Sequence, residues 1–508
     1  MQNSHRTLKR TLSNNAYLII SALFLLLLIA ILCIFGYTPT NDGEGYLDYA
    51  RIALAEHQPY PSPKTILGQP FIWNPGIINL IILSLWAFQS LWPLLLTLCL
   101  MKALSAFLVA KIASKLFSHQ TALIALFLYI LYPNNWGQST MLSSEIPMVF
   151  FTLLAVNLSL KNNNSPRLLR PHRNHNYPRV FQPRQSLLRP RRIHIPLQFL
   201  AGITLAIANW FRPVATIFLV ALVLYHLLKR SRLLRPRRNP TRPILHLLSG
   251  YILTILLIGT SCYLRTGYFI YQSDTLWFNM AEATYEKDPQ PHYSTEMFPP
   301  GTARYIQDMQ HKTAIECSHI WRQRSLKWLA KHPAQYLSKI PARLYYVYKN
   351  DIDNLSAFLH DKSNPAENYV TLPLKSILHL SKTSLTFREG TAVASLAIIT
   401  TIFYILLLLS AIIATITTLR TNRHSPLNPQ RHFHSEAEKQ LSTLNITLLL
   451  FIIIAGSLAL VLAVHGETRF KAPFMPFIFI LALIKEKVSH ESVPGTNSPN
   501  SFKSRPAV

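Results

Sequence analysis

The chain has 508 residues, of which 50% are apolar and only 14% are charged, whereas about a quarter of the residues of a soluble protein are charged. Long uncharged runs account for the difference, and they exclude a set of soluble domains. The net charge of +28 does not indicate nucleic-acid binding. Its arginines gather in two blocks, 167–192 and 229–242, between apolar segments, and no nucleic-acid motif accompanies them.

Four uncharged runs reach the length of about 20 residues that a bilayer-spanning helix needs. They are Tyr17–Tyr37, Ile244–Leu264, Thr391–Thr418 and Leu444–Val464. Cytoplasmic loops carry an excess of Lys and Arg, which puts the N-terminus and both arginine blocks inside. This orientation favours a single inward crossing at Leu94–Leu116, with Gly76–Trp92 in or near the outer leaflet, although the apolar pattern by itself also allows Gly76–Trp92 to cross.

Shorter apolar segments complete the predicted topology. They are Thr121–Tyr132, Glu145–Leu160, Ile195–Phe211, Val214–Leu228 and Ala472–Ile484. The sequence therefore predicts an all-α polytopic membrane protein, a bundle of about ten spans with both ends in the cytoplasm. All but four of the 22 acidic residues then fall on the outer side, where we expect the functional face.

The predicted topology divides the chain into four parts. Residues 1–264 form an N-terminal transmembrane region with a first outer loop at 38–75, and residues 265–390 form an outer, periplasmic loop domain. Residues 391–485 form a C-terminal transmembrane region, and 486–508 a cytoplasmic tail. Within the outer domain, Trp321–Tyr348 has the pattern of an amphipathic helix with Trp321, Leu326, Leu329 and Tyr336 near one face. We expect it to lie on the membrane or to cap a cavity.

An acidic cluster follows the first predicted span. In "NDGEGYLDYARIAL" (Asn41–Leu54), Asp42, Glu44 and Asp48 lie within seven residues and alternate with tyrosines such as Tyr46. A carboxylate that loses hydration at a membrane surface becomes a stronger base, which suits a general base that accepts a proton from an attacking hydroxyl or amide. A solvated loop with incidental acids is the alternative interpretation.

Three polar stretches interrupt the apolar segments on the outer side. They are "PNNWGQSTMLSSE", ending at Glu145, "NWFRP" with Arg212, and "HGETRFKAPFMP" with Glu467, Arg469 and Lys471. Irregular backbone at membrane depth occurs only where it is buried in protein or lines a wet cavity, so we expect one cavity that opens outward. The side chains of Arg212, Arg469 and Lys471 suit the binding of a phosphate group. Alternatively, they extend to the membrane interface, where their charges reach water. Glu145 could equally cap a helix, and Glu467 could pair with Arg469.

The ordered motifs resemble those of the GT-C glycosyltransferases, the superfamily of protein O-mannosyltransferases and bacterial lipid A aminoarabinose transferases. "NDGEGYLDYARIAL" resembles their first outer loop, and "LSSEIPMVFFTLLAV" their S-E-x-P motif. "GETRFKAPFMPFIFILA" resembles their terminal E-x-R-[FY]-x-x-P-x-x-P motif. The chain departs from the pattern in two places. Gly43 separates Asp42 from Glu44, and "GITLAIANWFRPVA" lacks the second glycine of the family's helix pair.

The resemblance implies an inverting transfer of sugar from a polyprenyl-phosphate carrier to an acceptor on the outer face, which would be a protein, a lipid or a glycan. It assigns Asp42, with Glu44, to the catalytic site and Arg212, Arg469 and Lys471 to the donor phosphate. Tyr46, Glu145 and Glu467 would have supporting roles. We predict no metal site and no resident cofactor, although some relatives use a divalent cation. A bacterial inner membrane with the active site facing the periplasm is the expected location, with membrane lipids as further partners and no nucleic acid.

Two other functions fit parts of the pattern. A transporter or flippase of lipid-linked saccharide would also use interrupted helices, but no internal repeat is visible and the polar breaks gather on one side. An O-antigen polymerase or ligase would rely on arginines in a large outer loop rather than on Asp42. The four cysteines show no disulfide or metal-ligand spacing.

Overall fold

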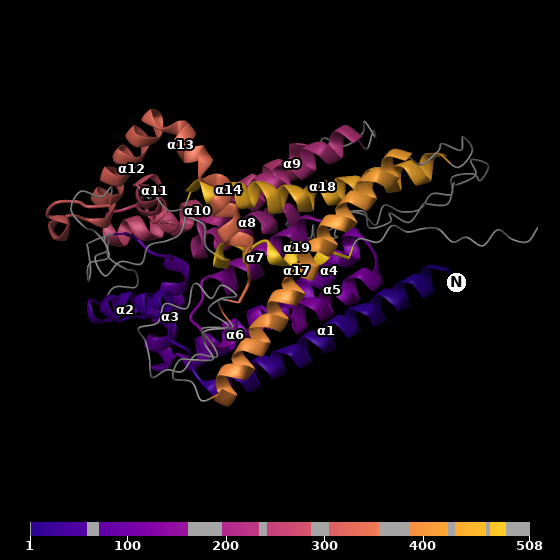
Figure 1. Cartoon of the computed structure of the whole chain (residues 1–508), viewed down its shortest axis with the longest axis horizontal. Helices are drawn as coiled ribbons and strands as arrows, with labels where there is room; N and C mark the ends of the chain where they lie inside the picture. The colour runs from indigo at the N-terminus through magenta and orange to yellow at the C-terminus, as the bar shows by residue number, and fades with distance from the viewer. Residues whose placement is uncertain are drawn as a thin grey trace, which may run out of the picture.

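The computed structural model describes residues 2–57, 71–160, 196–232, 241–285, 304–352, 354, 387–424, 432–463 and 468–483. Every regular element within these ranges is a helix (Figure 1). The N-terminal half contains α1 (Gln2–Phe35), α2 (Asn41–Ala55), α3 (Pro75–Phe88), α4 (Trp92–Leu116), α5 (His119–Leu131), α6 (Asn134–Gly137), η1 (Gln138–Thr140), α7 (Glu145–Ser159), α8 (Leu197–Phe211), η2 (Pro213–Ala215), α9 (Thr216–Arg232) and α10 (Thr241–Thr266). The remainder contains α11 (Leu276–Tyr285), η3 (Met309–His311), α12 (Ala314–Lys331), α13 (Pro333–Ser338), α14 (Ile340–Tyr348), α17 (Phe387–His424), α18 (His432–Ala463), η6 (Thr468–Lys471) and α19 (Met475–Leu481).

Five segments are long and apolar enough to cross a bilayer, which identifies a multi-pass membrane protein. They are Asn14–Phe35, Trp92–Leu116, Thr241–Thr266, Ser395–Thr417 and Thr443–Ala463. The four long runs predicted from the sequence and the crossing at Leu94–Leu116 are thereby confirmed as helices of sufficient length. α3 has only 14 residues, which agrees with an apolar helix that does not cross at 76–92.

The other predicted crossings are shorter helices, so ten spans are not confirmed. α5, α7, α8 and the segment Pro213–Lys229 have at most 17 residues each. α7 forms a bent pair with the turns Asn134–Thr140, at an angle of 117°. The segment predicted to span at 472–484 forms the seven-residue helix α19, in which every residue is buried. Protein rather than lipid surrounds α19, because it packs between α17, α18, α5 and α4.

Two glycines bring α8 and α10 into direct backbone contact. A Cβ atom on Gly202 would lie 2.0 Å from the carbonyl oxygen of Leu247, and one on Gly250 would lie 2.1 Å from that of Phe199. Small residues allow such close helix packing in membranes. Arg212 follows the C-terminal end of α8.

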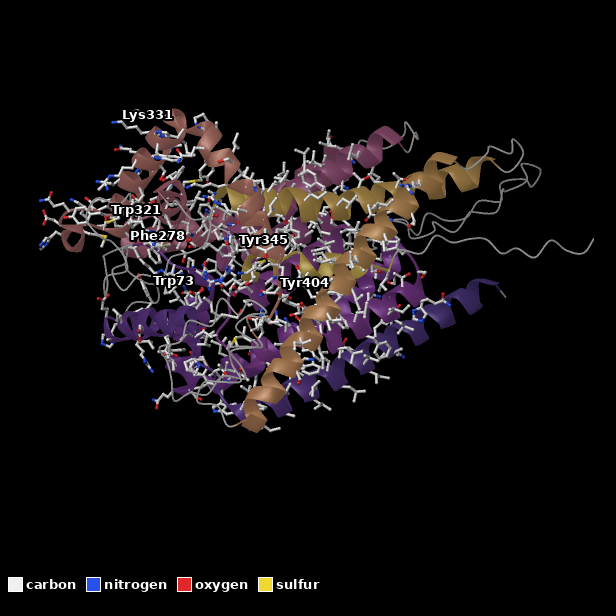
Figure 2. The ribbon with its side chains drawn as sticks, viewed as in Figure 1. Trp73, Phe278, Trp321, Lys331, Tyr345 and Tyr404 are labelled. Atoms are coloured by element: carbon white, nitrogen blue, oxygen red, sulfur yellow. The ribbon has the colours of Figure 1, made fainter. Side chains whose placement is uncertain are left out.

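α2, α3 and α11 to α13 gather at the end of the molecule opposite the N-terminus (Figure 1). An aromatic column joins the two groups, with Phe71 and Phe278 ring centroids 4.6 Å apart and Phe278 and Trp321 centroids 5.3 Å apart. Figure 2 shows Trp73, Phe278 and Trp321 in line along this column. The backbone amide of Asp274 also donates to the carbonyl of Ile72, at 2.9 Å.

The single amphipathic helix predicted at Trp321–Tyr348 is wrong. Pro333 and Pro341 lack the amide hydrogen that a continuous helix requires, and the segment divides into α12, α13 and α14 at these points. Trp321 and Tyr336 are buried as expected, but Leu326 is 46% exposed. The buried face of α12 instead continues from Trp321 to Ser325, one helical turn later.

Candidate active site

The acidic cluster lies at the start of a helix rather than in a loop. Thr40 caps α2, and its side-chain oxygen accepts a hydrogen bond from the amide of Gly43 at 3.1 Å. Asp42 and Glu44 therefore occupy the first turn, where the helix dipole stabilises negative charge. This local stabilisation explains why acids are compatible with the position, and the fold determines what each acid contacts.

Four charged side chains from distant parts of the sequence meet at this turn. Asp42 lies on α2, Glu145 begins α7, Arg212 follows α8, and Arg469 lies in η6. We call these four residues the acid–arginine cluster. An Nη1 of Arg469 lies 2.5 Å from Oδ2 of Asp42, and an Nη2 of Arg212 lies 3.9 Å from the same oxygen. The Nη2 of Arg212 also lies 2.5 Å from Oε1 of Glu145.

The two arginines are held differently. Arg212 is 17% exposed and has a further contact, since its Nε donates to Oγ of Ser144 at 2.7 Å. Arg469 is 34% exposed and contacts Asp42 at the open side of the cluster. Arg212 is therefore fixed between Glu145 and Ser144, whereas the guanidinium of Arg469 has more room to change partner.

Hydrogen bonds from neighbouring polar side chains support the acid–arginine cluster. The side-chain amide of Asn74 donates to the hydroxyl of Tyr46 at 2.7 Å and to Oγ of Ser144 at 3.1 Å. Burial, with the neighbouring Asp42 charge, raises the pKa of Tyr46, so its phenol stays neutral and acts as a hydrogen-bonding group. Ser143 donates to Oε2 of Glu145 at 2.8 Å. These contacts hold Arg212 and Glu145 in place.

The other two acids of α2 point elsewhere. Glu44 accepts a hydrogen bond from the hydroxyl of Tyr37 at 2.7 Å, and burial followed by this hydrogen bond raises the pKa of Tyr37. Asp48 is half exposed and forms a long 3.7 Å pair with Arg51. Of the predicted catalytic pair, the structure brings only Asp42 to the arginines, because side chains two residues apart do not share a helix face.

Lys471 differs from its predicted role at the donor phosphate. The side chain is fully buried, and its Nζ donates to the carbonyl oxygens of Val347, Asn350 and Thr468. An ammonium group has three donors, so all of them are used within the protein. Glu467, predicted as a supporting residue, lies outside the described residues.

A divalent cation finds few ligands here. The described part of the chain contains no group of three His, Cys, Asp or Glu side chains suited to a metal ion. The two carboxylates of the cluster, Asp42 and Glu145, are both paired with guanidinium groups. This donor set does not fit Mg²⁺, which prefers oxygen ligands without competing cations, and we derive no step through a metal.

Sequence reasoning missed Asn74 and Ser144, which organise the site. Both residues lie directly before a helix. Asn74 precedes the proline that begins α3, and Ser144 precedes Glu145, the first residue of α7. A polar side chain next to an apolar helix start is the available signal. It does not reveal that Asn74 and Ser144, 70 residues apart in the chain, form a hydrogen bond.

No protein-family model matches the chain, and no curated protein sequence matches it. Solved structures of the oligosaccharyltransferase of Archaeoglobus fulgidus align with most of this chain. The apo form aligns with 92% of this chain and 49% of its own, at 11% identity and a TM-score of 0.44. AglB in complex with an inhibitory peptide and a dolichol-phosphate aligns with 92% and 49%, at 13% identity and a TM-score of 0.45.

The chain thus spans about half the length of these enzymes. At this identity and TM-score, the roles of the residues in the acid–arginine cluster have to follow from their own contacts.

Proposed function

We propose that this protein is an inverting glycosyltransferase, which transfers a sugar from a polyprenyl-phosphate carrier to an acceptor at the outer face of the membrane. One observation supports the proposal most. A carboxylate, Asp42, lies between two guanidinium groups, 2.5 Å from Arg469 and 3.9 Å from Arg212. Direct displacement from a lipid phosphate requires a base for the acceptor proton and cations for the leaving phosphate. Asp42 and the two arginines would supply these.

The proposed reaction is a single displacement. An acceptor hydroxyl or amide loses its proton to Asp42 while its oxygen or nitrogen attacks the anomeric carbon of the donor. The bond from that carbon to the phosphate oxygen breaks, and its electron pair leaves with the polyprenyl phosphate. Arg212 and Arg469 stabilise the negative charge that develops on the leaving phosphate. No enzyme nucleophile takes part, so the anomeric centre inverts.

The charges of the cluster suit this sequence of events. Without substrate, two carboxylates balance two guanidinium groups. When Asp42 takes the acceptor proton, it loses its charge at the step in which the phosphate gains one. With Asp42 neutral, the positive charge of both guanidinium groups acts on the leaving phosphate alone. Stabilisation that appears only as the reaction proceeds lowers the barrier rather than the ground state.

Donor binding also has to prepare the base. Oδ2 of Asp42, the oxygen nearest both arginines, already contacts the guanidinium of Arg469. A donor phosphate offers Arg469 an alternative bidentate partner. Arg212 stays with Glu145 and Ser144, so Arg469 is the residue that we expect to exchange its partner when donor binds.

A transporter of lipid-linked saccharide is the second candidate. The 117° bend between Asn134–Thr140 and Glu145–Ser159 favours it, because broken helices line substrate sites in transporters. A transporter would move the lipid-linked sugar without breaking the bond to phosphate. It would not require the carboxylate of Asp42 as a proton acceptor.

The deciding experiment uses purified protein in liposomes with a radiolabelled polyprenyl-phosphate sugar and candidate acceptors on the outer side. We expect labelled acceptor and an equal amount of free polyprenyl phosphate, at a rate that depends on Asp42. Movement of intact donor between leaflets, with no free polyprenyl phosphate in any acceptor mixture, would instead support the transporter. Asp48→Asn is the matched control, since Asp48 lies on the same helix but outside the cluster.

A further inference from the structure

A second buried charge pair lies behind Arg469. The Nζ of Lys471 lies 3.0 Å from Oδ1 of Asp351, and Oδ2 of Asp351 accepts a hydrogen bond from the hydroxyl of Tyr132. The ring of Tyr404 faces the same ammonium, with its centroid 5.2 Å away. We call Lys471, Asp351, Tyr132 and Tyr404 the lysine anchor. All four are buried.

The lysine anchor joins four parts of the chain that lie far apart in the sequence. Tyr132 ends α5, Asp351 follows α14, Tyr404 lies on α17 and Lys471 ends η6. The carbonyl oxygens of Val347 and Asn350 also accept from the ammonium, at 3.1 Å and 2.5 Å. A buried ion pair with all its hydrogen bonds satisfied permits one arrangement of its surroundings. The anchor therefore fixes η6 against α5, α14 and α17.

Hydrogen bonds hold the backbone on both sides of Arg469. The ammonium of Lys471 donates a hydrogen bond to the carbonyl oxygen of Thr468, at 2.8 Å, and Thr468 directly precedes Arg469. On the other side, the amide of Ala472 donates to the carbonyl of Arg469 at 3.1 Å, and the amide of Phe474 donates to that of Lys471 at 2.8 Å. The backbone before Arg469 is thus tied to the ammonium of Lys471, and backbone hydrogen bonds hold the turn after it.

We propose that the Lys471–Asp351 pair is a positioning device for Arg469, which sets its guanidinium at the distance from Asp42 that donor phosphate requires. This inference rests on the glycosyltransferase function proposed above. Lys471 and Asp351 do not touch the substrate. They act through the backbone of η6, and their loss leaves Arg469 present but displaced.

The proposal predicts a specific coupling in a double-mutant cycle. Asp351→Asn keeps the shape of the side chain and a hydrogen-bond acceptor for Tyr132 but removes the ion pair. We expect it to raise the donor KM roughly tenfold, with a much smaller effect on kcat, because one charge-assisted contact to phosphate is misplaced. In the Arg469→Ala background the same change should alter KM by less than about twofold, since coupled residues are not additive.

Ser159→Ala provides the matched control. Ser159 is buried and bonds Gln198 and His226, but it lies at the opposite end of α7 from Glu145, roughly 20 Å along the helix axis. We expect equal small KM effects for Ser159→Ala in both backgrounds. If Asp351→Asn multiplies the donor KM by the same factor with and without Arg469, the pair contributes only to general stability and the proposal is wrong.

A thiol-labelling experiment tests the position of residue 469 without measuring catalytic turnover. In a chain with the exposed Cys33 replaced by Ala, Arg469→Cys is modified by a small impermeant thiol reagent. We expect Asp351→Asn to accelerate this modification several-fold and Ser159→Ala to leave it unchanged. Unchanged labelling in Asp351→Asn would overturn the positioning role. If the wild-type protein cleaves no lipid donor but Asp351→Asn still accelerates the labelling of Arg469→Cys, only the proposed function is overturned.

Tyr132→Phe keeps the test available if Asp351→Asn does not fold. It removes the hydroxyl that donates to Asp351 and leaves the ion pair to Lys471 in place. We expect a KM rise of about two- to threefold, smaller than for Asp351→Asn because the ion pair remains and only one hydrogen bond to it is lost, again absent in the Arg469→Ala background. The same rise in both backgrounds would count against the proposal.

Discussion

Replacing Asp42 by Asn tests the proposed chemistry most directly. Asn keeps the size of the side chain and can still accept a hydrogen bond from Arg469, but it cannot take a proton from an acceptor. Because Thr40 caps α2 through its own oxygen, the helix should still begin at the same residue. The variant therefore removes a proton acceptor and one charge while leaving the local fold in place.

Two effects of opposite sign follow. General-base catalysis contributes about 10²–10⁴-fold, so kcat should fall by that factor. The arginines lose a competitor for phosphate, and two unit charges about 4 Å apart interact by about 4 kcal/mol at an effective dielectric constant of 20. Asp42 and Arg469 are 26% and 34% exposed, so solvent screening reduces this to about 1 kcal/mol. The donor KM should then fall about fivefold.

The assay is donor-dependent transfer at matched expression, with Glu44→Gln and Asp48→Asn measured in parallel. Glu44 bonds Tyr37 and lies outside the cluster, so its loss should cost less than about tenfold. A normal kcat in Asp42→Asn would refute the mechanism. A reduced kcat with a raised donor KM would show that Asp42 organises the arginines instead of accepting the proton. A larger defect in Glu44→Gln would move the base to that residue and leave the reaction class intact.

The remaining predictions concern the cluster, its packing and its orientation. Arg469→Ala should lower donor kcat/KM roughly tenfold or more, and Arg469→Lys should recover part of it, which donor titration would show. Gly45→Ala should lower the free energy of unfolding by about 1–3 kcal/mol and should also lower the transfer rate. The new Cβ would lie 2.0 Å from the ring of Trp73, beside Asn74. Gly202→Ala should lower stability in detergent by at least as much, since backbone of α10 lies 2.0 Å away; an unchanged melting temperature would contradict the close crossing. A cysteine at Lys331 should react with an impermeant reagent in intact cells and one at Arg184 should not, and labelling at Arg184 would reverse the topology.

Much of the architecture follows from local sequence. The run from Tyr17 to Tyr37 has no charge, and an apolar helix of that length is the stable state of such a run in a bilayer. The sequence also predicts the helix break before Glu145, since "PNNWGQSTMLSSE" is too polar for the middle of a membrane span. The polar stretches identified the segments that carry Asp42, Glu145, Arg212 and Arg469, because a charge beside an apolar helix is costly unless it has a partner.

Tertiary structure alone decided which charges belong together. Arg469 and Lys471 are two residues apart and both positively charged, and nothing in their spacing distinguishes their roles. η6 turns one toward Asp42 at the open side and buries the other against Asp351. Asp42 and Glu44 are separated in the same way, because α2 directs one toward Arg212 and the other toward Tyr37. Sequence determines the number and type of charges near the outer face, whereas pairing depends on contacts between residues as much as 427 positions apart, which only the packed helices bring together.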